Sequence, residues 1–213
     1  MSEGQVAALL LWLVLLAFSL NASLLRTLHA NPLYQHLCLG SAIVLVPLWT
    51  LRAGLHEGLE IHFLGLTSLT LLLGWRLALL APCLTLLILG AFGVTDLAEF
   101  GWQALIGVAL PVATSWLLFL GSWAWLPRHL FVYLFVAAFL GGALSISVKI
   151  LASALLMGMS GAYPWHTISA DCLSIWPLLL FPEALLNGMA MTLLAVYRPH
   201  WVNTFFDREY LGR

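Results

Sequence analysis

Residues 53–65 read Ala53-Gly54-Leu55-His56-Glu57-Gly58-Leu59-Glu60-Ile61-His62-Phe63-Leu64-Gly65, and they separate two long apolar runs. Two histidines and two glutamates fall within a few positions of each other, in a chain of which only 8% is charged. Imidazole and carboxylate groups are common ligands of divalent metal ions. The stretch therefore predicts the outer mouth of a transport site between membrane-crossing segments.

The composition excludes a soluble globular domain. The chain has 213 residues, 62% of them hydrophobic, and its mean hydropathy is +1.02, whereas soluble domains are usually about half apolar. Apolar runs near or above about 18 residues recur along the whole length. They predict an all-α, polytopic transmembrane bundle that forms a single integral membrane domain over residues 1–213. The net charge of -1 argues against nucleic acid as a partner.

We expect about seven helices, with one short or broken helix near residues 62–75. A single helix from His62 to Val94 would be about 50 Å long, too long for a hydrocarbon core of about 30 Å. Gly74-Trp75-Arg76 offers a break, and a half-helix is tolerated where it is buried in protein or lines a cavity. The predicted helices are Val6–Leu25 (a retained helix, not a signal peptide), Leu37–Ala53, Phe63–Gly74, Leu77–Val94, Gln103–Gly121, Leu130–Met159 and Leu173–Tyr197.

Basic residues predict the orientation. Seven helices place the N-terminus outside and the C-terminus in the cytoplasm, across the inner membrane of a bacterial cell. The inner side then holds Arg26, Arg76, Arg128, Arg198, Arg208 and Arg213. The outer side holds Glu3, Glu57, Glu60, Asp96, Glu99 and Asp171. An outer vestibule rich in carboxylates attracts cations, although membrane loops also simply tolerate acids there.

His62 is the first candidate metal ligand, because a histidine at the outer end of a short helix can bind a metal through a neutral ring nitrogen. The alternative is a helix-end anchor, in which the ring is hydrogen-bonded to a backbone carbonyl. His56 and Glu60 are further candidates, because they would share one face of a helix and a loop would also allow them to surround one ion. The alternative for them is a solvated outer loop, with Glu57 paired to Arg52.

Lys149 and Glu183 are the ionisable residues inside predicted spans. Charges within the membrane are costly, so they normally face a cavity or each other. For Glu183, a structural pairing between helices and a transport role both remain open. Lys149 either faces the cavity or extends its ammonium group toward the outer surface.

The segment from His62-Phe63-Leu64-Gly65 to Leu72-Leu73-Gly74 resembles the H-L-L-G…L-L-G helix of the CbiM/NikM family. These proteins are the substrate-binding membrane subunits of nickel and cobalt energy-coupling-factor transporters. The downstream order is similar too: an apolar helix ends at Phe92-Gly93, a glycine-rich helix carries residues 107–112, and a late helix carries Pro182-Glu183-Ala184-Leu185-Leu186-Asn187-Gly188. The resemblance covers roughly residues 37–197.

This resemblance implies an importer component that captures a divalent transition metal ion, cobalt or nickel, as its substrate. It also implies ATPase and transmembrane coupling subunits as partners in the lipid bilayer, no organic cofactor and no enzyme activity. The family typically begins Met-His and uses that N-terminus as a ligand, whereas this chain begins Met1-Ser2-Glu3. Only the internal histidine, matched by His62, carries over. The alternative is a non-transporting accessory or sensor protein that keeps the fold and has lost the metal site.

Overall fold

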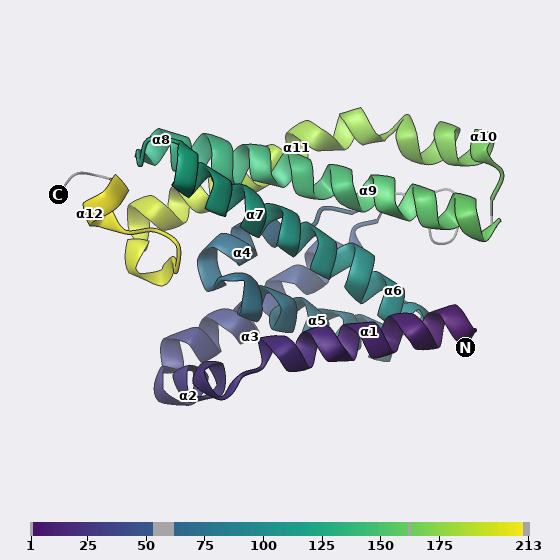
Figure 1. Cartoon of the computed structure of the whole chain (residues 1–213), viewed down its shortest axis with the longest axis horizontal. Helices are drawn as coiled ribbons and strands as arrows, with labels where there is room; N and C mark the ends of the chain where they lie inside the picture. Colours follow the sequence, from purple (N-terminus) through teal and green to yellow (C-terminus); the bar gives the residue numbers. More distant parts are fainter. Residues whose placement is uncertain (1, 53–61, 162, 211–213) are drawn as a thin grey trace.

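The computed structural model describes residues 2–52, 62–161 and 163–210, and within these ranges the regular elements are all helical (Figure 1). The longer helices are α1 (Glu3–Ser19), α3 (Pro32–Thr50), α5 (Trp75–Ala91), α7 (Leu110–Trp125), α9 (Gly141–Ser160) and α11 (Trp176–Tyr197). The shorter helices are α2 (Ala22–Ala30), α4 (Leu66–Leu73), α6 (Phe100–Ala104), α8 (Leu130–Val132), α10 (Trp165–Ile168) and α12 (Asp207–Tyr210). Short 3₁₀ segments are η1 (Leu97–Glu99) and η5 (Pro199–Trp201), and π-helical segments are η2 (Leu105–Ala109), η3 (Tyr133–Leu140) and η4 (Ser169–Leu173).

Within the described ranges, four helical segments are long and apolar enough to cross a membrane. They are Pro32–Thr50, Leu97–Trp125, Leu130–Ser160 and Trp176–Tyr197. A fifth span results if α1 and α2, which are bent by 70°, count as one. Large apolar side chains such as Phe18 and Phe181 are exposed on the outside of the bundle, where lipid would cover them. The predicted all-α membrane bundle is confirmed.

The prediction for the first helix and the link after it was wrong. The first helix was expected to reach Leu25, but α1 ends at Ser19 and α2 turns away from it. The sequence also predicts a polar link over residues 26–36, between the first two expected helices, but α2 and the start of α3 occupy most of it. The reason lies in two asparagines: the side chain of Asn21 accepts a hydrogen bond from the Leu24 N–H (2.8 Å), and that of Asn31 accepts one from Leu33 (3.1 Å). Such side chains begin helices by satisfying N–H groups that lack an intrahelical partner.

Two later boundaries also differ from the prediction. The segment between residues 160 and 171 was expected to be a loop, but it contains α10 and the start of η4. Here the ring of Trp165 packs so closely on Gly158 that a Cβ on that glycine would lie 2.5 Å from it. The Leu97–Trp125 span begins at Leu97 rather than at the expected Gln103, because the side chain of Asp96 accepts a hydrogen bond from the Ala98 N–H (2.8 Å).

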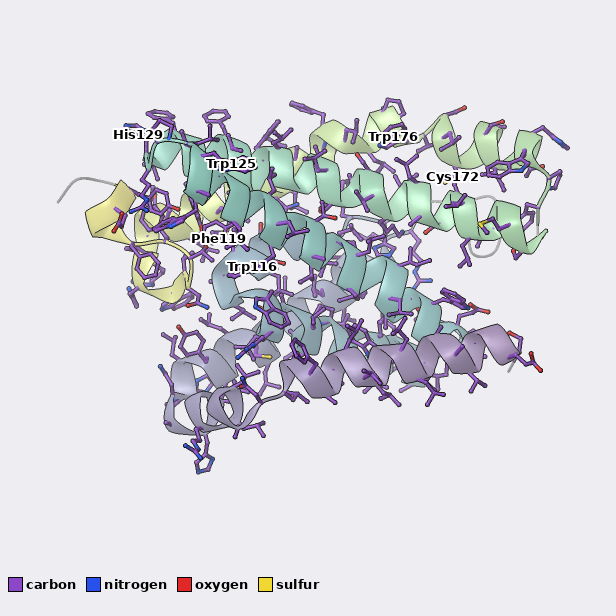
Figure 2. All side chains as sticks on the ribbon, viewed as in Figure 1. Trp116, Phe119, Trp125, His129, Cys172 and Trp176 are labelled. Carbon is purple, nitrogen blue, oxygen red and sulfur yellow. The ribbon has the colours of Figure 1, made fainter. Side chains whose placement is uncertain are left out.

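The two termini lie at opposite ends of the bundle (Figure 1). At the C-terminal end, Arg128 donates a hydrogen bond to the carboxylate of Glu209 (2.6 Å). Trp125 and His129 lie toward the same end (Figure 2), and Trp125 is 88% exposed, as expected for an aromatic side chain at a membrane interface.

α4 is the predicted half-helix. It spans Leu66–Leu73, with seven of its eight residues buried, and it packs against α5, α7, α9 and α11. The two glycines that flank it, Gly65 and Gly74, have φ angles of 65° and 80°, which favour glycine over other residues. The short-helix prediction is confirmed, with slightly narrower bounds than Phe63–Gly74.

Both ends of α4 are capped by residues far away in the sequence. At the N-terminal end, the carboxylate of Glu183 accepts hydrogen bonds from the N–H groups of Leu64 and Gly65 (2.9 Å each), and the Asn187 side chain accepts one from the Ser68 N–H (2.8 Å). Because unsatisfied backbone groups are costly away from water, such caps allow a helix to end inside a membrane protein.

At the C-terminal end of α4, the tail of the chain supplies the donors. The hydroxyl of Thr204 donates to the Leu71 carbonyl (2.8 Å), and the backbone N–H and side chain of Asn203 donate to the carbonyls of Leu72 (2.9 Å) and Leu73 (3.2 Å). The tail therefore belongs to the folded bundle and completes the hydrogen bonding of a helix that begins more than a hundred residues earlier.

Candidate functional site

A cavity of about 1000 Å³ lies toward the N-terminal end of the bundle. The start of α1, the end of α3, α6 with η2, and the second half of α9 contribute to its walls. Figure 1 shows the N-terminus, α6 and the C-terminal end of α9 gathered at this end of the molecule. A volume of this size admits a fully hydrated metal ion, since one water occupies about 30 Å³ of liquid.

His62 lines this cavity, in the connection that leads into α4. Its Nδ1 lies 3.0 Å from the carbonyl oxygen of Phe63. Because a carbonyl can only accept, the neutral ring carries its proton on Nδ1, and Nε2 keeps a free lone pair. Metal-binding histidines usually donate their other ring N–H in this way. The same hydrogen bond is what a helix-end anchor would show, so the geometry fits both of the interpretations proposed from the sequence.

Trp49, near the end of α3, holds the segment that carries His62. Its indole ring packs against the imidazole with 5.2 Å between ring centroids, and its Nε1 donates to the carbonyl oxygen of Leu64 (3.2 Å). Trp49 also lines the cavity. The sequence did not predict this role, because a tryptophan inside an apolar helix resembles any other packing residue.

Charges of both signs line the cavity. Asp96 and Glu99 contribute carboxylates, as predicted for a vestibule, and Arg52 and Lys149 contribute cations. Lys149 is buried and interacts electrostatically with both His62 and Glu183. Of the two alternatives left open for Lys149, the structure shows the one in which it lines the cavity.

The imidazole of His62 is expected to stay neutral in mild acid. Desolvation by the surrounding protein, and next the positive charge of Lys149, hold its pKa below the usual 6.5. Metal binding through this ring should therefore change less than about threefold between pH 7.5 and 5.5, whereas an ordinary histidine would lose about tenfold. Equilibrium binding of Co²⁺ at both pH values checks this. A tenfold loss at pH 5.5 would show that the ring titrates normally.

The described N-terminal residues are held at the rim of the cavity. Ser2 and Gln5 form a capping box, in which the Ser2 hydroxyl accepts from the Gln5 N–H (3.3 Å) and the Gln5 side chain accepts from the Ser2 N–H (2.6 Å). The Gln5 amide also donates to Glu99 (2.6 Å). The side chains of Ser2 and Gln5 are thus engaged in capping α1.

His62 is the one predicted metal ligand that the structure describes. His56 and Glu60, like Glu57, lie outside the described residues. Over the described part of the chain, no three His, Cys, Asp or Glu side chains cluster closely enough to hold a metal ion. The structure thus places His62 in the cavity and leaves the three-residue site as a prediction.

The comparison with protein families decides the classification. A family model described as CbiM, cobalt uptake substrate-specific transmembrane region, matches residues 2–201. The chain belongs to the CbiM family. The resemblance inferred from the His62–Gly74 segment is thereby confirmed, and it extends well beyond the range of residues that first suggested it. The CbiM family comprises transmembrane components of cobalt uptake rather than enzymes. No curated protein and no solved structure matches the chain.

Proposed function

We propose that this CbiM chain is the membrane component of an energy-coupling-factor-type importer and captures a divalent transition metal ion at the outer face. Cobalt is the expected substrate, and nickel is chemically close to it. ATPase and transmembrane coupling subunits would supply the energy. The end that carries the cavity would face outside, and the end with Arg128 and the C-terminus would face the cytoplasm of a bacterial cell.

The position of His62 carries this proposal. Its ring lines a cavity wide enough for a hydrated ion, and its hydrogen bond to the Phe63 carbonyl leaves Nε2 available as a ligand. The carboxylates of Asp96 and Glu99 along the same cavity favour the entry of cations. His56 and Glu60 are proposed to complete the coordination, because both precede His62 by only a few residues.

Metal binding by the purified chain tests the proposal. The full-length protein in lipid nanodiscs should retain about one Co²⁺ per chain after desalting. Excess Ni²⁺ should displace the bound Co²⁺, whereas Mg²⁺ should not, since imidazole is a poor ligand for hard cations. Cobalt at the level of empty nanodiscs would contradict capture. It would leave the alternative of an accessory or sensor protein with this fold.

A further inference from the structure

The backbone directly after His62 is fixed from α11. We call residues 62–65 the His62 loop. Its last two N–H groups, those of Leu64 and Gly65, each donate to a different oxygen of the Glu183 carboxylate at 2.9 Å. The carbonyl of Leu64 accepts from Trp49 on the other side (3.2 Å). The peptide groups that follow His62 are thus held from two different helices.

Glu183 is itself held in place. The Asn187 side chain, one turn further along α11, donates to Glu183 Oε1 and to the Glu183 carbonyl, at 2.8 Å each. Asn187 also accepts from the Ser68 N–H (2.8 Å) and the Ser68 hydroxyl (2.9 Å). Glu183 and Asn187 are both fully buried. The carboxylate therefore has a single position, and the His62 loop takes its position from it.

We propose that Glu183 is a positioning residue for metal capture: from α11, it fixes the His62 loop and thereby the direction of the imidazole. This inference rests on the proposed function, since it assigns His62 as a metal ligand. A carboxylate suits the task because both of its oxygens accept, so it can hold two adjacent N–H groups at once. The position of Gly65, which has a φ of 65°, depends on the same pair of hydrogen bonds.

The variant Glu183→Gln tests this idea. An amide has one accepting oxygen and one donating nitrogen, so one of the two N–H groups would lose its partner. Amide hydrogen exchange of residues 62–69 should become at least about tenfold faster in nanodiscs without metal. The affinity for Co²⁺ should fall about tenfold. Mutations of residues that hold metal ligands in place typically lower metal affinity by about 10- to 100-fold, and this loss would lie at the lower end of that range.

Thr204→Val is the matched control. It removes the hydrogen bond from Thr204 to Leu71, at the opposite end of the same helix, together with the one between the hydroxyls of Thr204 and Tyr133 (2.7 Å). It changes none of the hydrogen bonds of the His62 loop. Exchange should rise near the C-terminal end of α4, while Co²⁺ affinity should stay within about twofold of wild type. A loss of affinity equal to that of Glu183→Gln would mean that any weakening of α4 has this effect, and the positioning role would be wrong.

Glu183→Asp separates position from charge. It keeps the negative charge near Lys149 but withdraws the carboxylate by one methylene from Leu64 and Gly65. The proposal expects weakened Co²⁺ binding here too, and wild-type affinity would overturn it. Aspartate also serves as the test if the glutamine variant does not fold. Should the wild-type chain bind no Co²⁺, the proposed function fails, and unchanged exchange of residues 62–69 in both variants would separately disprove the positioning.

Discussion

Replacing His62 with alanine should weaken Co²⁺ binding by more than about 100-fold. Mutations of residues that only hold a metal ligand in place lower metal affinity by about 10- to 100-fold. This variant would remove a ligand itself, so its effect should be larger. Asp96 and Glu99 would still draw cations into the cavity, so weak, salt-sensitive binding should persist. Titration with Co²⁺ at low and at moderate ionic strength measures both components.

His200→Ala provides the control for this variant. His200 lies exposed in the C-terminal tail, where it contacts the ring of Trp201, and it does not line the cavity. Its removal should leave Co²⁺ affinity unchanged, and thermal unfolding would verify that both variants are folded. Equal cobalt retention by wild type and His62→Ala would refute the role of His62. It would favour the helix-end anchor formed by the hydrogen bond to Phe63.

Gly101→Ala should destabilise the bundle more than any other glycine-to-alanine change within the Leu97–Trp125 span. A Cβ at this position would lie 2.5 Å from the backbone nitrogen of Leu9 and 2.9 Å from the carbonyl carbon of Ala8. These are backbone atoms of α1, which no side-chain rotation can move aside. The overlap can be relieved only if α1 moves away from α6. Overpacking of this kind typically lowers the free energy of unfolding by about 1–3 kcal/mol.

Gly121→Ala is the comparison for Gly101→Ala. It lies in the same continuous helical span, and a Cβ there would have no neighbour within 4 Å. Alanine also favours helices over glycine by up to about 1 kcal/mol. Thermal unfolding in one detergent should thus show a lower midpoint for Gly101→Ala and an unchanged or higher one for Gly121→Ala. The same midpoint for both would show that α1 and α6 are not in close contact.

The sequence predicted those parts of the fold that follow from length and hydropathy. The half-helix was predictable because the apolar run after His62 is too long for one span and contains Gly74. α2 was missed, because two single asparagines, Asn21 and Asn31, mark its boundary and the start of α3. One capping side chain changes the direction of a chain without altering its hydropathy.

Within the candidate site, residue types were predictable but partners were not. Glu183 was recognised as an intramembrane charge that needs a partner, and the structure shows such a pairing, while the transport role left open beside it stays a prediction. Its hydrogen-bond partners, however, are N–H groups 118 and 119 positions away. Nearly every residue carries the same backbone N–H and carbonyl groups, so the sequence does not indicate which of them a distant side chain will bind. Neither this pairing nor the one between Trp49 and Leu64 could therefore be predicted.

The long separation between α4 and its caps has a consequence for biosynthesis. Ribosomes add about 5–20 residues per second, so some 6–24 s pass between the synthesis of the first turn of α4 and that of Glu183. Thr204 follows later still. During this interval both ends of α4 lack their final partners, so the nascent half-helix has to be sheltered by the insertion machinery or by water at the interface. We expect α4 to settle into the bundle last, although it is one of the earlier helices to be made.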